Sequence, residues 1–177
     1  MYTIVMDLET TGLSTINDEP IQACWTVFDK RGRLRRSRLI YINTSKTIHP
    51  KAMEVHKITH EFLHDNGVKP AQAAEAYTKL IWEFQPAIII GYNILGFDFP
   101  MWQNFMVNYK SGMFKFPPVT TVIDVLHMAS QYFRTKKRLK QAEAGRRLGL
   151  TVVEADLHDA RADNELCWDI YQKLIKE

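Results

Sequence analysis

Cysteine is scarce in this chain, because only Cys24 and Cys167 occur among its 177 residues. The two lie far apart in the sequence and do not form the closely spaced pair that a metal site uses. Both fall in segments with an apolar pattern, where a reduced, buried thiol is the expected state. The cysteine usage therefore favours a reducing, cytoplasmic setting.

Long apolar runs are also missing. No stretch approaches the roughly 20 apolar residues that span a bilayer, so we expect no membrane partner. The first residues, MYTIVMDLE, have neither the basic start nor the cleavage site of a signal peptide. With 46% hydrophobic and 24% charged residues the composition is that of an ordinary globular protein, which excludes disordered and fibrous classes. We expect one domain spanning residues 1–177.

A large excess of one charge is absent, since the net charge is only +3, but the basic residues are clustered. Six of the nine residues from Lys30 to Arg38 are basic, and a second segment, Arg134–Lys140, holds five cations. Clusters of this kind can give a positive face that binds nucleic acid. The alternative for the first cluster is a solvated edge hairpin whose charges prevent edge-to-edge pairing. Both interpretations stay open at this point.

The order of the apolar segments predicts an α/β fold with a mixed sheet. Residues 2–8 form a dense apolar run that is typical of a central strand buried on both faces, and residues 87–91 form a second one. Further strands are expected at 20–29, 33–42 and 119–123, with a hairpin joining the first two. Helices are expected from Pro70 to Pro86, from Pro100 onward, and near 124–133, 139–148 and 159–175, with short helical turns at 51–56 and 60–65.

Two carboxylates, Asp7 and Glu9, come at the end of the first predicted strand. Residues two apart on a strand point to the same face, roughly 6.6 Å apart along it. A lone buried charge would be costly there, so the pair indicates a site that binds something positive. If the strand instead ended at Met6, both carboxylates would simply reach solvent.

Asp98 is ambiguous by itself. It follows the 87–91 strand by one loop and comes just before Pro100, at the start of a predicted helix. Aspartate is a favoured N-cap, which would explain the residue without any further role. Capping and metal binding do not exclude each other.

Asp163 is the most informative carboxylate. On the last predicted helix it shares a face with Cys167, Ile170 and Leu174, so it points toward the core. A buried, unpaired carboxylate is improbable, and metal coordination or an ion pair must compensate it. His158 is better placed in the loop before this helix, with Asp159 as the N-cap, and from there its imidazole could lean over the same site.

Three motifs together resemble the DnaQ-like, or DEDDh, 3′→5′ exonuclease family. The first reads MDLETTGL at 6–13, the second GYNILGFDFP at 91–100, and the third HDARAD at 158–163. The segments 52–59 and 139–150 are similar to stretches that the family carries between the motifs. The resemblance covers nearly the whole chain, in order.

The second motif departs from the family pattern at two points. Tyr92 stands where the family usually has histidine, and Asp98 lies five places after Asn93 instead of four. The longer spacing is more similar to TREX-type exonucleases and to the exonuclease domains of family B polymerases. The proposed metal ligands remain in place, but the branch, and with it the natural substrate, is not fixed.

The resemblance implies a ribonuclease H-like fold, with a mixed five-stranded sheet and helices on both faces. It also implies a two-metal hydrolysis of phosphodiester bonds at the 3′ end of DNA, with single-stranded ends preferred and nucleoside 5′-monophosphates released. The metal ligands for two Mg²⁺ or Mn²⁺ ions would be Asp7, Glu9, Asp98 and Asp163. His158 would act as general base, and its imidazole is partly free to accept a proton at neutral pH.

The resemblance likewise implies that Thr10, Thr11 and Leu13, together with Asn93 of the second motif, bind the 3′-terminal nucleotide. From the charge pattern we add Lys136 and Lys137 as contacts to the phosphate backbone. An exoribonuclease acting on RNA ends or short oligonucleotides is the alternative, because no residue reads the 2′-hydroxyl reliably. Nothing in the sequence identifies a polymerase or other protein partner.

Two other functions compete with a nuclease. Residues 60–64 read HEFLH, which has the spacing of a zinc protease helix. That helix is cut short at once by Asp65-Asn66-Gly67, and a zinc protease leaves Asp163 unexplained. The second competitor is a nuclease fold that binds nucleic acid without cutting it. We disfavour it because all five expected catalytic residues are present.

Overall fold

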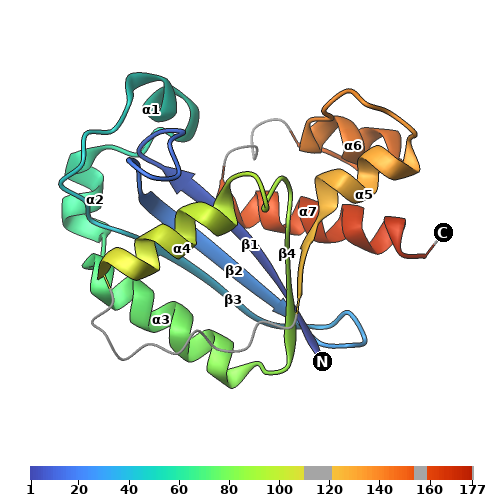
Figure 1. Ribbon diagram of the computed structural model, residues 1–177, viewed down its shortest axis with the longest axis horizontal. Coiled ribbons are helices and arrows are strands. Elements are labelled where there is room, and N and C mark those ends of the chain that lie inside the picture. Colours follow the sequence, from blue (N-terminus) through green and yellow to red (C-terminus); the bar gives the residue numbers. More distant parts are fainter. Residues whose placement is uncertain (110–120, 154–158, 177) are drawn as a thin grey trace.

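The computed structural model describes residues 1–109, 121–153 and 159–176, and Figure 1 shows how its elements are arranged. The five strands are β1 (Tyr2–Thr10), β2 (Pro20–Phe28), β3 (Leu34–Tyr41), β4 (Ala87–Gly91) and β5 (Thr121–Asp124). They form one sheet in the order β3-β2-β1-β4-β5. The pairs β1/β2 and β2/β3 are antiparallel, whereas β1/β4 and β4/β5 are parallel. The mixed sheet expected from the sequence is confirmed.

The helices are α1 (Pro50–His56), α2 (His60–Asn66), α3 (Pro70–Glu83), α4 (Asp98–Tyr109), α5 (Val125–Tyr132), α6 (Gln141–Arg147) and α7 (Ala160–Leu174). Proline at the first position of α3 costs nothing, because that amide has no helical partner. The predicted start of α4 was wrong, because this helix begins at Asp98 and not at Pro100. The first turn of a helix tolerates proline, so Pro100 does not mark the start. No helix in the described part of the chain has the length and apolar character that crossing a membrane requires.

The two faces of β1 bury different side chains because residues alternate along a strand. Ile4, Met6 and Leu8 point into a core shared with α3 and α4. Val5 points to the opposite face, into a core shared with α5, α6 and α7. Since Asp7 and Glu9 continue the alternation of Val5, both carboxylates lie on the α7 side of the sheet.

The basic hairpin between β2 and β3 lies at the end of the sheet away from these carboxylates. In the register of β1 with β2, Thr3 is opposite Phe28 next to the hairpin, whereas Glu9 is opposite Gln22. β3 is the edge strand of the sheet, and its first five residues are exposed. Arg36 forms an ion pair with Glu83 of α3 at 2.6 Å. This placement favours the charged edge hairpin, which blocks pairing with another sheet.

Candidate active site

β1 delivers two carboxylates to one place. The strand continues through Thr10, so the possibility that it ends at Met6 is excluded. Asp7 and Glu9 therefore point to the same side, and α7, which packs on that side, adds Asp163. One carboxylate oxygen from each of Asp7, Glu9 and Asp163 lies within 4.8 Å of the other two. We call these three residues the acidic cluster.

The start of α7 is bonded directly to the sheet. Asp159 is the N-cap, as predicted, and accepts hydrogen bonds from the amides of Arg161 and Ala162. Asn164, fully buried, donates its amide to the carbonyls of Val5 (3.2 Å) and Cys24 (3.1 Å). Because Asn164 follows Asp163, these bonds fix where the helix presents that carboxylate. Sequence reasoning missed Asn164, whose only signal was a polar residue beside a predicted ligand.

Gln22 on β2 is a second residue that the motifs did not indicate. Its side-chain oxygen accepts a hydrogen bond of 3.2 Å from the amide of Ala160, the first residue of α7. That amide is one of the helical donors without a partner inside the helix, so a buried acceptor satisfies it. Gln22 lies opposite Glu9 in the pairing of β1 with β2. The hydrogen bond from α7 to β2 is therefore formed beside the position of Glu9 in the sheet.

Asp98 lies next to the cluster and is buried. Its Oδ1 accepts a hydrogen bond of 3.2 Å from the amide of Leu8, the residue between the two β1 carboxylates. Asp98 is the first residue of α4 and is tied to β1, so its role goes beyond that of an N-cap. The second motif is thereby held against the first.

A buried aspartate that no motif indicated organises the loop before Asp98. Asp124 at the end of β5 accepts hydrogen bonds from the amides of Asn93 (2.9 Å) and Leu95 (3.2 Å) in the β4–α4 loop. It also caps α5 by accepting from the amide of Leu126 at 3.0 Å. Asn93 has a positive φ of 62°, a conformation that asparagine adopts more readily than most residues. The loop that leads to Asp98 therefore depends on Asp124.

The loop after β1 is stabilised by its own threonines. The Thr10 hydroxyl donates to the carbonyl of Gly12 at 2.7 Å, and the Thr11 hydroxyl contacts Asp18 at 2.9 Å. Both side chains are buried, so in this structure they shape the loop. Leu13 is 86% exposed, which leaves its side chain available to an incoming nucleotide. The nucleotide-binding roles expected for these residues remain predictions.

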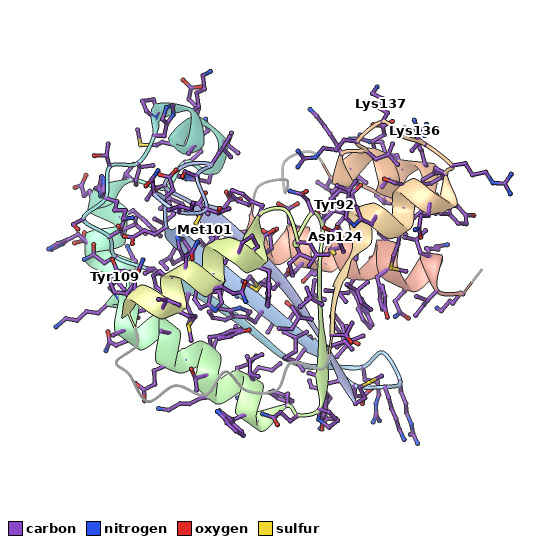
Figure 2. The ribbon with its side chains drawn as sticks, in the orientation of Figure 1. Tyr92, Met101, Tyr109, Asp124, Lys136 and Lys137 are labelled. Carbon is purple, nitrogen blue, oxygen red and sulfur yellow. The ribbon has the colours of Figure 1, made fainter. Side chains whose placement is uncertain are left out.

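The other sequence-predicted residues lie as follows. Lys136 and Lys137 are exposed in the segment between α5 and α6 (Figure 2). Asn93 is half-buried in the β4–α4 loop. His158 lies outside the described residues, so its proposed role as general base remains a prediction.

Burial and mutual repulsion raise the pKa values of the carboxyl groups at this site. Burial raises the pKa of Glu9 to about 8, and the negative charges of Asp163, Asp98 and Asp159 add to the effect. Burial raises the pKa of Asp98 to about 8, although its hydrogen bonds oppose the shift. The pKa of Asp7 is raised well above its usual value by burial first, then by Asp98, Asp163 and Glu9. The site is therefore destabilised when it is fully ionised and needs positive charge.

Divalent cations fit this arrangement. Mg²⁺ and Mn²⁺ prefer oxygen ligands, and the cluster offers three carboxylates within reach of one ion, with Asp98 beside them. A cation would also remove the repulsion that raises the pKa values. The zinc protease alternative has no such support: His60, Glu61 and His64 on α2 are exposed, and His64 instead contacts Asp65 at 2.9 Å.

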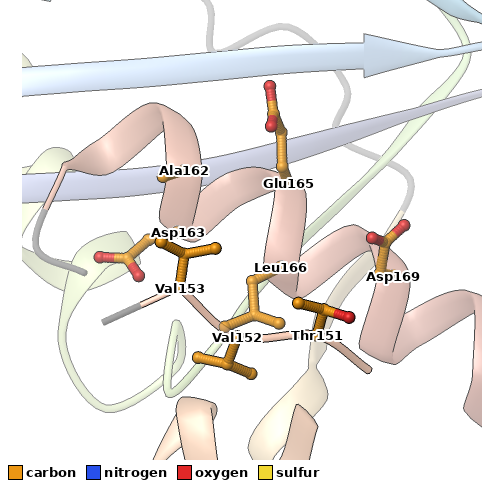
Figure 3. A pocket seen from close by; sticks show the side chains of 8 residues that line it. All are labelled: Thr151, Val152, Val153, Ala162, Asp163, Glu165, Leu166 and Asp169. Carbon is orange, nitrogen blue, oxygen red and sulfur yellow. The ribbon is translucent and has the colours of Figure 1, made fainter. Parts of the chain in front are cut away.

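All three residues of the acidic cluster are half-buried, and Asp163 also borders a cavity. This residue lines a cavity of about 200 Å³ between α7 and residues 151–153. Figure 3 shows Asp163 and Asp169 at opposite ends of the cavity, with Val152 and Leu166 between them. Asp163 therefore belongs both to the acidic cluster and to the lining of this cavity.

The raised pKa values predict how metal-free stability depends on pH. In the unfolded chain these groups ionise near pH 4, whereas Glu9 and Asp98 in the folded protein keep their protons up to about pH 8. The folded state thus holds more protons between pH 4 and 8, so the free energy of unfolding falls as pH rises through that window. Metal binding offsets this loss, and we expect the increase in melting temperature caused by Mn²⁺ to be larger at pH 8 than at pH 5.

Thermal denaturation in EDTA and in Mn²⁺ across this pH range checks the prediction. Comparing the two series at each pH cancels the contributions of titrating groups elsewhere in the molecule. A stabilisation by Mn²⁺ that stays constant from pH 5 to pH 8 would contradict it.

Comparison with known proteins agrees with this geometry. Residues 4–171 match the family described as RNase T exonuclease. The chain belongs to this exonuclease family. The match covers nearly all of the chain, and it confirms the resemblance to DEDDh exonucleases that the three motifs indicated. No curated protein matches the chain as a relative.

Solved structures show the same fold. The zinc-bound E. coli ExoI–ssDNA complex has a TM-score of 0.82 at 20% identity, covering 99% of this chain and 40% of that one. E. coli exonuclease I with a dA16 oligonucleotide gives 0.80 at 20%, covering 99% and 40%. The ExoI/SSB-Ct complex gives 0.79 at 19%, covering 99% and 41%. The ribonuclease H-like fold is confirmed, and the chain spans about two fifths of the length of these proteins.

Proposed function

We propose that this chain is a metal-dependent 3′→5′ exonuclease that removes nucleoside 5′-monophosphates from single-stranded DNA ends. The observation that carries the proposal is the acidic cluster, in which three carboxylates from β1 and α7 converge within 4.8 Å. Family membership makes nucleic acid the substrate class. The single-stranded DNA in the exonuclease I complexes supports the choice of DNA over RNA.

The carboxylates would hold Mg²⁺ or Mn²⁺, with Asp7, Glu9, Asp98 and Asp163 as ligands. Two such ions, when bound, would lower the pKa of the attacking water and stabilise the departing 3′-oxygen. β1, α4 and α7 keep the four carboxyl groups in place, so little reorganisation is needed before the reaction. His158 would accept the proton of the water, as the third motif implies.

The substrate strand would be held by two surfaces. At the site, the exposed Leu13 and the β4–α4 loop with Asn93 would contact the terminal nucleotide. Away from the site, the exposed Lys136 and Lys137 would neutralise phosphates of the strand. Base identity would not be read by these contacts, which is consistent with an enzyme that removes successive nucleotides.

The experiment is the digestion of end-labelled substrates of one sequence as single-stranded DNA, duplex DNA and RNA, each with Mg²⁺ or Mn²⁺. We expect a 5′-labelled single strand of DNA to give a ladder that shortens from the 3′ end and to be cut faster than the duplex and the RNA. Release of the labelled 5′-terminal mononucleotide as the first product would overturn the polarity. Faster digestion of the RNA would show that the chain is an exoribonuclease instead.

A further inference from the structure

Tyr92, the residue that departs from the family pattern, connects two parts of the molecule. It follows β4 directly, and its hydroxyl donates a hydrogen bond of 3.0 Å to the carbonyl of Leu139, 47 residues along the chain. Histidine, the usual residue at this position, has no hydroxyl that could donate this hydrogen bond to the carbonyl of Leu139. Tyr92 precedes Asn93, whose amide is held by Asp124, so the loop on one side of this bond is itself fixed.

A second hydrogen bond lies two residues further along the chain. The side-chain amide of Gln141, at the start of α6, donates to the backbone carbonyl of Asp163 at 2.6 Å. Leu139 itself is 1% exposed and packs into the core shared by α5, α6 and α7. Residues 139–141 are therefore fixed at two points, one on the loop that leads to Asp98 and one on the helix that carries Asp163.

The residues held in this way end the basic segment Arg134–Lys140. The five cations of this segment are all exposed, and Leu139 is the one buried residue of the segment. Burial raises the pKa of the Tyr92 phenol, and the positive charge of Arg138 in the basic segment opposes that shift. Figure 2 shows Tyr92 and Asp124 beneath the part of the molecule that displays Lys136 and Lys137.

We propose that Tyr92 and Gln141 are positioning residues that hold the basic segment in a fixed place relative to the acidic cluster, so that its cations bind the phosphates of the strand entering the site. A flexible loop would lose conformational freedom on binding, whereas a segment already bonded to the loop of Asp98 and to α7 pays less of that cost. The inference rests on the proposed exonuclease function and names the residues that build its strand-binding surface.

The test is the variant Tyr92→Phe, which removes only the hydroxyl. We expect the Kd for a single-stranded oligonucleotide, measured with Ca²⁺ in place of Mg²⁺, to rise roughly three- to tenfold, the range of one lost hydrogen bond. The KM should rise in parallel and kcat should change little, because the acidic cluster is untouched. The dependence of log Kd on log salt should also become shallower.

Three further variants complete the design. The double variant Lys136→Ala with Lys137→Ala gives the reference effect for loss of binding by the basic segment. Losing two single-strand phosphate contacts should flatten the slope of log Kd against log salt by roughly 1.4. Gln141→Ala breaks the second anchor and should act in the same direction as Tyr92→Phe. Tyr109→Phe is the matched control. Tyr109 is the last residue of α4, and the variant removes only its hydroxyl, which donates to Glu19 at 2.9 Å, so Kd and slope should stay at the wild-type values.

The outcomes separate the inference from the proposed function. If the wild-type protein digests single-stranded DNA and both Tyr92→Phe and Gln141→Ala keep the wild-type KM and salt slope, the positioning role is wrong and the nuclease assignment stands. A fall in kcat at unchanged KM would also overturn it, since the hydroxyl would then act on the catalytic site. If the wild-type protein neither binds nor cuts a single strand, both proposals fail.

Discussion

Replacing Asp7 by asparagine should lower exonuclease activity by at least roughly three orders of magnitude while leaving the protein folded. Asp7 is the β1 carboxylate that interacts with Asp98, Asp163 and Glu9 at once. An amide of the same shape removes the charge of a proposed metal ligand, and transition-state stabilisation by bound metal amounts to several kcal/mol. Initial rates on single-stranded DNA with saturating Mg²⁺ measure the loss.

The same change should not destabilise the metal-free protein. Asp7→Asn removes one of several partly buried carboxyl groups that repel one another, so the melting temperature in EDTA should hold or rise at pH 8. If the folded variant keeps near wild-type turnover, with contaminating nuclease excluded, Asp7 is not part of the active site. A variant that unfolds would show instead that the carboxylate is needed for the structure.

The second large effect is expected at a residue that no motif contains. Asp124→Ala should lower the free energy of unfolding by about 2–4 kcal/mol, because the amides of Asn93, Leu95 and Leu126 all lose their acceptor. Activity should fall further than stability alone explains, since the β4–α4 loop then no longer holds Asp98 in place. Chemical denaturation and rates measured well below the melting temperature separate the two losses.

Thr59→Ala is the matched control for this prediction. Thr59 caps α2 by accepting from the amide of Phe62 at 3.1 Å, in an exposed position. Losing that cap should cost about 1 kcal/mol and leave the rate unchanged. If Asp124→Ala behaves like Thr59→Ala in both measurements, Asp124 is a helix cap and does not support the active site.

The parts of the site that follow from local periodicity could be predicted from the sequence. Alternation along a strand placed Asp7 and Glu9 on one face, and the 3.6-residue repeat of a helix turned Asp163 toward the core with Cys167 and Ile170. Asp7 and Glu9 do lie together, within 4.8 Å of Asp163. Cys167 and Ile170 are buried on α7, whereas Asp163 itself is half-buried. The N-cap at Asp159 followed in the same way from its type and its place before an apolar pattern.

The supporting hydrogen bonds could not be predicted, because they join residues far apart in the chain. Asn164 reaches Val5 across 159 positions, and Asp124 reaches Asn93 across 31. No periodic pattern records such a pairing, and an isolated asparagine or aspartate is more often a surface or capping residue. Local patterns likewise could not place the basic hairpin, whose position at the far end of the sheet depends on the register of β2 with β1.

We expect the acidic cluster to cut single-stranded DNA from its 3′ end, and one time course tests this role most directly. A 5′-labelled single strand is incubated with Mg²⁺ and either the wild-type protein, Asp163→Asn or Glu165→Gln, all purified in the same way. Glu165 is an exposed carboxylate on the same helix and lies outside the cluster, so it controls for charge. We predict a ladder shortening from the 3′ end with the wild type and Glu165→Gln, and intact strand with Asp163→Asn. The same ladder at the same rate with Asp163→Asn would contradict a catalytic role for the acidic cluster.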